Sequence, residues 1–157
     1  MKITQITLSF LASIMIAHYS ISQTDSADMI LGEWTPGHGD ARVKITRENN
    51  AFIGTIVWLK EPIDKKTGEP RTNNNSRDSA LRDQPLLGLR IVDGFQYANG
   101  QLWEDGTVYD PESGRTYCGK ITLINKNELR LRGNICGLSL LGRNDTWIRY
   151  RDADTTP

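Results

Sequence analysis

From Leu31 onward, apolar and polar positions alternate with the two-residue period of β-strands. Val43 and Ile45 alternate with polar neighbours and predict a half-buried strand over residues 42–47. The run 51–59 (AFIGTIVWL) is apolar on both faces; a buried helix is the alternative, but Gly54 and the β-branched content favour a strand with one face under a loop. Further strands are expected at 101–109, 116–124, 129–136 and 146–150. Short strands at close spacing predict an all-β fold, a small antiparallel β-barrel whose closure removes exposed edges.

The segments between these strands carry turn and loop signals. Asn49-Asn50 and Asp110–Gly114 have the composition of tight turns, and this favours a hairpin role for the acids Asp110 and Glu112 over catalysis. Residues 60–80 have almost nothing to bury and predict a long polar surface loop, extending to about residue 85. Loops of this length are usually functional or disordered. The apolar residues 86–92 are expected to form a helical turn leading into a strand.

The most regular hairpin lies on either side of Asn125–Asn127. Odd-numbered positions of both strands are apolar or small and share one face. A three-residue loop at 126–128 would pair Leu123 with Leu131 and place Cys118 opposite Cys136 on the outer face, within reach of a disulfide. Two free thiols are the alternative, and a one-residue slip would move one cysteine to the apolar face.

The first 22 residues have the pattern of a secretory signal peptide. Lys2 is their only charge, the apolar run 6–17 follows, and Ser20 and Ser22 precede a cut before Gln23; cleavage after Gln23 is equally compatible. A first helix of the fold or an uncleaved anchor is the alternative. We expect a periplasmic or secreted protein with one barrel domain over 23–157, no membrane span after cleavage, and an oxidising environment that favours a disulfide over a metal site.

Composition narrows the classes of function. Without residues 1–22, 18 basic residues face 19 acidic ones, and no basic run stands out. Nucleic-acid binding is therefore not expected. No phosphate-binding loop or metal motif appears, so no cofactor and no metal is expected. The one histidine after the leader, His38, lies in a glycine-rich turn, and a carboxylate pair such as Glu104 or Asp105 with Asp110 has no catalytic context, so no catalytic residue is assigned.

Two groups of residues resemble known families. Gly32-Glu33-Trp34 in the first strand and Arg149 in the last resemble the lipocalin-like (calycin) barrels, in which a G-x-W tryptophan packs near the closed end beneath a basic side chain. Trp34 and Arg149 are accordingly interpreted as structural. A wider set resembles the exported bacterial family called domain of unknown function 2147: Gly32-Glu33-Trp34, Gly54–Leu59, Leu81-Arg82, Pro85–Gly88, Trp103, Gly106, Tyr109–Pro111, Ser113-Gly114, Tyr117, Leu140–Arg143 and Thr146–Arg149.

This second resemblance implies a periplasmic address and a small β-barrel but no activity. Members of the family carry an Asp and an Asn-Pro pair in the long loop. Here the corresponding stretch is 73–78 (NNNSRD), so that part departs from the family pattern.

Two hypotheses of function follow, neither of them enzymatic. The first is a barrel that binds a small apolar or amphipathic ligand. Its candidate ligand-binding residues are aromatic or cationic: Trp58, Arg90, Trp103, Tyr109, Tyr117 and Trp147, with Arg149 as an alternative cation. The second hypothesis is an envelope module that meets an unknown protein partner through the 60–85 loop.

Overall fold

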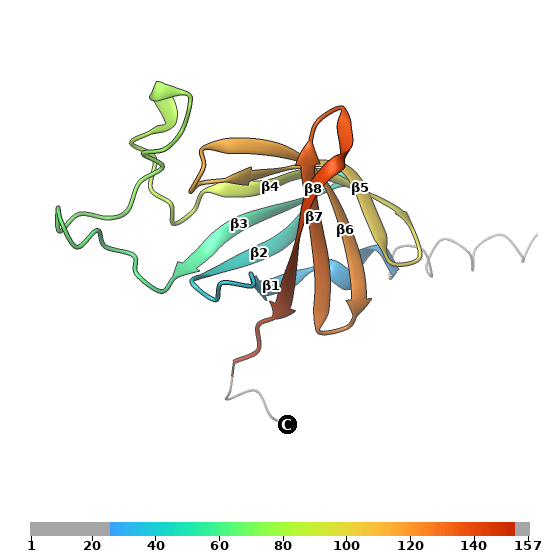
Figure 1. The fold of residues 1–157 in the computed structure, drawn as a ribbon. Coiled ribbons are helices and arrows are strands. Elements are labelled where there is room, and N and C mark those ends of the chain that lie inside the picture. The colour runs from blue at the N-terminus through green and yellow to red at the C-terminus, as the bar shows by residue number, and fades with distance from the viewer. Residues whose placement is uncertain (1–25, 153–157) are drawn as a thin grey trace, which may run out of the picture.

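A computed structural model describes residues 26–152, which form a closed barrel of eight antiparallel strands (Figure 1). Each strand pairs with the next, and the last returns to the first. The strands are β1 (Gly32–Thr35), β2 (Ala41–Glu48), β3 (Ala51–Leu59), β4 (Arg90–Asn99), β5 (Leu102–Asp110), β6 (Arg115–Asn125), β7 (Glu128–Ile135) and β8 (Leu138–Arg149). Two short 3-10 turns are η1 (Asp28–Ile30) and η2 (Ser79–Leu81). The all-β barrel predicted from the alternation is confirmed, and residues 51–59 are a strand rather than a helix.

Both ends of the chain fall outside this description. The signal peptide expected at 1–22 and the polar residues 153–157 lie outside the described residues. Among residues 26–152, no helix has the length and apolar character needed to cross a bilayer.

The interior of the barrel is filled by aromatic side chains. Trp34, Phe52, Phe95 and Trp103 are completely buried. A Cβ added at Gly106 would lie 2.2 Å from Cδ2 of Phe95, and one at Gly119 would lie 2.4 Å from its Cζ. The Phe95 ring therefore occupies the space that side chains on β5 and β6 would otherwise take, at the close packing typical of protein cores.

One end of the barrel is closed by contacts between its first and last strands. Trp34 of β1 pairs with Arg149 of β8, and the Arg149 guanidinium lies over the Trp34 ring. The Trp34 indole Nε1 donates to the carbonyl oxygen of Ile30 in η1 at 2.8 Å. These contacts hold the short first strand against the rest of the barrel.

The β6–β7 hairpin has the predicted faces but a different register. Its turn has two residues, so Asn125 pairs with Glu128, and an irregularity between Leu123 and Asn125 then pairs Leu123 with Leu129 rather than Leu131. A shift of two residues keeps every side chain on its face because the period of a strand is two. Cys118 consequently lies opposite Asn134, and the predicted disulfide to Cys136 forms diagonally, with Cα atoms 5.0 Å apart.

The last strand begins earlier than the strand predicted at 146–150. β8 begins at Leu138 and follows β7 after a turn of two residues, Cys136 and Gly137. The ladder is regular from Leu129 opposite Trp147 to Asn134 opposite Gly142, and then jumps to Ile135 opposite Leu138. This irregularity at residues 139–141 hides the strand from an alternation pattern.

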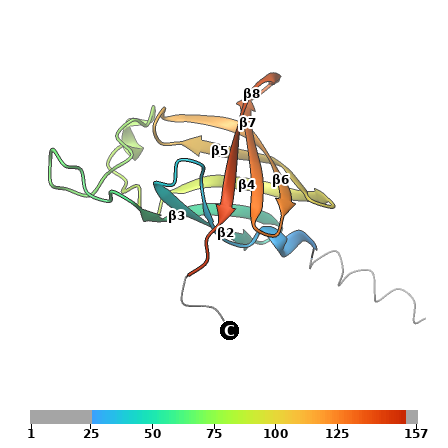
Figure 2. The same cartoon turned by 60° about the horizontal axis from the view of Figure 1, so that its bottom comes forward.

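The long loop between β3 and β4 is held in place by backbone hydrogen bonds. Figure 2 shows it at the far side of the barrel from η1. The Asn73 N–H donates to Gln84 O, and the Leu86 N–H donates to Arg71 O. Leu86 is buried in the core cluster, and Leu89 packs against that cluster. A hydrogen bond from Leu89 N to Leu86 O closes the turn that leads into β4.

Candidate functional site

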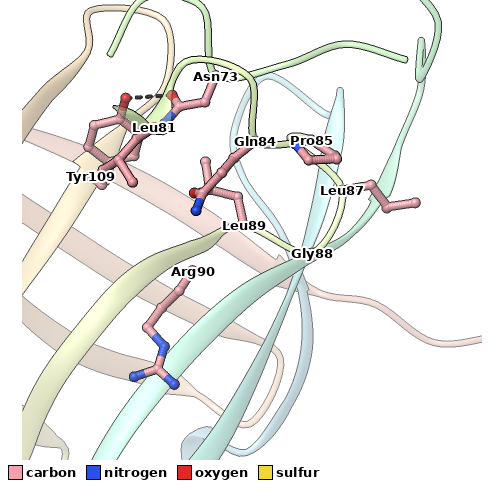
Figure 3. A pocket seen from close by; sticks show the side chains of 9 residues that line it. All are labelled: Asn73, Leu81, Gln84, Pro85, Leu87, Gly88, Leu89, Arg90 and Tyr109. Carbon is pink, nitrogen blue, oxygen red and sulfur yellow. Dashed lines mark hydrogen bonds between the residues drawn. The ribbon is translucent and has the colours of Figure 1, made fainter. Parts of the chain in front are cut away.

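A pocket of about 480 Å³ lies between the long loop and the first residues of β4 and last residues of β5 (Figure 3). Its volume is in the range of small-molecule sites. The loop supplies most of the wall and the barrel supplies two side chains. The lining residues are Asn73, Leu81, Gln84, Pro85, Leu87, Gly88, Leu89, Arg90 and Tyr109.

The polar end of the pocket is formed by Asn73 and Tyr109. The Tyr109 hydroxyl donates to Asn73 Oδ1 at 2.5 Å, and Figure 3 shows the two side chains facing each other. Asn73 is only 2% exposed although its residue type is usually at the surface. No hydrogen bond of Asn73 Nδ2 is found among the described residues, yet no side-chain polar atom there is both fully enclosed and unpartnered. Asn73 Nδ2 therefore keeps some access to solvent and remains available as a donor.

Apolar side chains and one amide form the rest of the wall. Leu89 lies in the centre of the view and Leu81 lies beside Tyr109, whereas Leu87 extends away from them (Figure 3). Gln84 has no side-chain hydrogen bond within the described chain, so both its amide donor and acceptor are free. A few polar groups in a mostly apolar wall suit an apolar body with a hydrogen-bonding head.

Arg90 adds little net charge to this pocket. Its Nη2 donates to both carboxylate oxygens of Glu48 at 2.9 Å, and its Nη1 donates to Asp93 at 3.2 Å. Desolvation acts to lower the pKa of Arg90, but the hydrogen bonds to Asp93 and Glu48 outweigh it and the net direction is upward. The guanidinium remains cationic and is compensated by two carboxylates, so the pocket does not select an anion.

The structure brings only two of the predicted ligand-binding residues, Arg90 and Tyr109, into this pocket. Trp103 lies in the core, where its Nε1 donates to Ala27 O at 3.2 Å. Trp147 is also buried and donates to Asp145 Oδ2 at 2.7 Å. Trp58 lies on the outer face beneath Arg42, with 4.8 Å between the guanidinium carbon and the ring centre.

Tyr117 is half-buried opposite Val108 on β5, and it does not line the pocket. The other seven lining residues were not predicted to bind a ligand; four of them, Leu81, Pro85, Leu87 and Gly88, were named only as part of the family resemblance. The length of the loop and its apolar end at residues 86–89 were the available signals. The burial of Asn73 has no signature in the sequence.

Two of the acidic residues considered for catalysis, Glu104 and Asp110, have other partners. Glu104 forms an ion pair with Lys120 at 3.2 Å. Asp110 accepts hydrogen bonds from Glu112 N at 2.9 Å and Ser113 Oγ at 2.6 Å, which confirms its role in the turn. His38 is exposed. Within residues 26–152, no group of three or more His, Cys, Asp or Glu side chains is placed to hold a metal ion.

Comparison with solved structures shows that the fold is similar to that of a lipocalin. The protein HP1028 from Helicobacter pylori, described as belonging to the lipocalin family, superposes with a TM-score of 0.66 at 15% identity, over 78% of this chain and 84% of that chain. A redesigned β-barrel covers 81% of this chain and 96% of its own at 11% identity, with a TM-score of 0.43. The first similarity establishes a lipocalin-like fold and nothing about the ligand.

Comparison of sequences adds one finding. A family model described as "Uncharacterized protein conserved in bacteria (DUF2147)" matches residues 32–149. This span runs from β1 to the end of β8 and so contains the whole barrel. A search of curated proteins returns no match.

Proposed function

This chain belongs to the DUF2147 family of uncharacterised bacterial proteins, and we propose that it is an exported, non-enzymatic protein that binds a small amphipathic ligand. The observation that carries the proposal is the pocket between the long loop and β4–β5, with Asn73 Nδ2 as an uncommitted donor at its polar end. The lipocalin-like fold supports ligand binding as the class of function.

The filled interior favours a ligand site outside the barrel centre. Lipocalin-like barrels hold a ligand only if side chains do not occupy the interior. Here Phe95 occupies the space beside Gly106 and Gly119, and Trp103 is fully buried. We therefore assign the ligand to the mouth of the barrel, under the long loop, rather than to its centre.

The lining chemistry indicates the kind of ligand. Asn73 Nδ2 donates, the Gln84 amide both donates and accepts, and Leu81, Leu87 and Leu89 offer apolar surface. The Arg90 charge is compensated by Glu48 and Asp93. An uncharged amphiphile with a carbonyl or hydroxyl head fits these groups better than a fatty-acid anion.

Export is supported by the leader pattern in residues 1–22 and by the Cys118–Cys136 disulfide, a bond typical of oxidising compartments. The absence of enzymatic activity is proposed because Glu104 and Asp110 are engaged in an ion pair and a turn.

The test is a fluorescence titration with Nile red, a neutral amphiphile that carries a carbonyl acceptor. We expect saturable binding that weakens about tenfold in a Leu81→Ser/Leu87→Ser variant, because both leucines line the pocket. Ile63→Ser is the matched control, since Ile63 is an exposed apolar residue of the same loop that does not line the pocket. Equal weakening by Ile63→Ser, or no saturable binding, would contradict the proposal and favour a loop that binds a protein partner.

Tyr109→Phe tests the polar end separately. Without the hydroxyl, Asn73 Oδ1 no longer accepts a hydrogen bond from residue 109, and the Asn73 side chain is free to reorient. We expect weaker probe binding with an unchanged apolar wall. Tyr97→Phe is the control because its hydroxyl also donates one hydrogen bond, to Gly100 O at 3.3 Å, outside the pocket.

A further inference from the structure

The tip of the β7–β8 hairpin exposes a group of apolar side chains that nothing in the barrel covers. Leu140 is 93% exposed and Leu141 is 64% exposed, and Ile135 and Leu138 are each about half exposed. We call these four residues the apolar tip. Scattered single apolar residues on a surface are ordinary, but a contiguous group at one projecting turn marks an interaction site.

The hairpin that carries the apolar tip is basic. The charged residues nearest the apolar tip are Arg132 and Arg143, whereas Asp145, opposite Leu131, and Arg130, opposite Thr146, lie farther along the hairpin. Arg143 is exposed opposite Gly133, and neither a hydrogen bond nor an ion pair of its side chain is found in the described part of the chain. Arg132 lies close to the tip, with its guanidinium carbon 3.3 Å from the position of a Cβ at Gly142.

The tip stands clear of the acidic turn between β5 and β6. Both views show the β7–β8 hairpin projecting from the barrel in a different direction from the β5–β6 turn (Figures 1 and 2). That turn, with Asp110 and Glu112, lies against the long loop, where Asn75 Nδ2 donates to the carbonyl oxygens of Pro111 and Glu112. The disulfide joins Cys136, in the turn of the hairpin, to Cys118 of β6 and so ties the hairpin covalently to the neighbouring strand.

We propose that the apolar tip docks on an anionic phospholipid surface. Apolar side chains at a protruding turn enter the boundary between headgroups and acyl chains, and adjacent arginines pair with phosphates. The charge of the hairpin decides between occupants: two copies meeting tip to tip would bring like charges together, whereas an anionic lipid surface attracts them.

Vesicle co-sedimentation tests this proposal. The protein is recovered after export by its host, and its intact mass establishes whether residues 1–22 are still attached. We expect binding to vesicles of phosphatidylcholine with phosphatidylglycerol, and much weaker binding to phosphatidylcholine alone. Leu140→Ser/Leu141→Ser should lower the partition coefficient at least about tenfold, and Arg143→Gln should lower it about fivefold.

The control is Ile148→Ser. Ile148 lies on the same strand and is 51% exposed, but it is near the opposite end of β8. It should leave partitioning unchanged. Equal binding by the double-leucine variant, or no binding of the wild type, would overturn the proposal. Equal binding to both vesicle types would overturn the anionic preference. If the wild type does not bind vesicles but sediments as a dimer, and the double-leucine variant does not form that dimer, the tip instead binds a second copy of the chain.

Discussion

The guanidinium carbon of Arg149 lies 4.1 Å from the centre of the Trp34 ring, and its terminal nitrogens donate to Leu31 O at 2.7 Å and Met29 O at 2.6 Å. One side chain of the last strand thus binds the first strand and the end of η1. Burial lowers the pKa of Arg149, followed by the repulsion of Arg151, but the group remains charged. Because β1 is short, it pairs with β8 at only two positions, and the Arg149 contacts add to that limited pairing.

Arg149→Ala is expected to lower the free energy of unfolding by about 2–4 kcal/mol, since it removes a cation–π contact and charged hydrogen bonds. Urea unfolding followed by circular dichroism measures the change. Arg149→Lys keeps the charge but loses the forked set of donors, so its free energy of unfolding should lie between those of the wild type and Arg149→Ala. Arg130→Ala, at an exposed position of β7, is the control; an Arg149→Ala variant as stable as that control would contradict the closure role.

Gly106→Ala is expected to lower the free energy of unfolding by about 1–3 kcal/mol, because its Cβ would overlap the Phe95 ring at 2.2 Å. Gly133→Ala is the matched control, since a Cβ there would meet Tyr117 at an ordinary 3.5 Å. A smaller residue at 95 should partly rescue Gly106→Ala in the double variant Gly106→Ala/Phe95→Leu. If Gly106→Ala costs no more than Gly133→Ala, the interior beside Phe95 has spare room and a ligand in the barrel centre becomes tenable.

The disulfide joins positions separated by 18 residues, and its loss should cost roughly 3 kcal/mol on the chain-entropy estimate. Cys118→Ser/Cys136→Ser measures this loss in urea unfolding. Intact mass should rise by the two hydrogens of one disulfide on reduction under denaturing conditions. An unchanged mass would show that the purified protein lacks the bond.

The acid titration of Asp64 gives a local prediction. Backbone N–H groups of Lys66 and Thr67 donate to Asp64 Oδ1 at 2.7 and 3.3 Å, and these hydrogen bonds hold its pKa below the usual 3.8. The ionised carboxylate therefore stabilises the turn at pH values above the lowered pKa, and this stabilisation is lost as the pH falls through that pKa. Amide NMR shifts of Lys66 and Thr67 should titrate with a midpoint below 3.8 and should not titrate in Asp64→Asn. A midpoint at or above 3.8 would contradict the hydrogen bonds.

Alternation predicted the faces of the strands better than their register. Leu123, Leu129 and Leu131 share the buried face as expected, because a shift of two residues preserves it. The register depends on two local features: whether the turn has two or three residues, which shifts the pairing by one residue, and an irregularity beside the turn, which shifts it by one more. The ladder shifts between Leu123 and Asn125, and no alternation pattern shows such a local irregularity.

Less of the candidate site than of the fold could be predicted from the sequence. Tyr109 and Arg90 were identified as polar or aromatic side chains in strands, and both line the pocket. Asn73 belongs to a run of asparagines that has the composition of a solvated loop, and only the tertiary contact with Tyr109 explains its burial. Large aromatic residues such as Trp103 suit a ligand wall and a packed core equally well, so composition could not separate the two roles.

Native mass spectrometry of the protein, recovered gently from its own host after export, tests ligand binding most directly. The account predicts a discrete extra mass that is lost on denaturation, is reduced in Leu81→Ser/Leu87→Ser and is retained in Ile63→Ser. A bare mass in the gently handled wild type, or the same extra mass in the pocket variant, would contradict a ligand bound between the long loop and β4–β5.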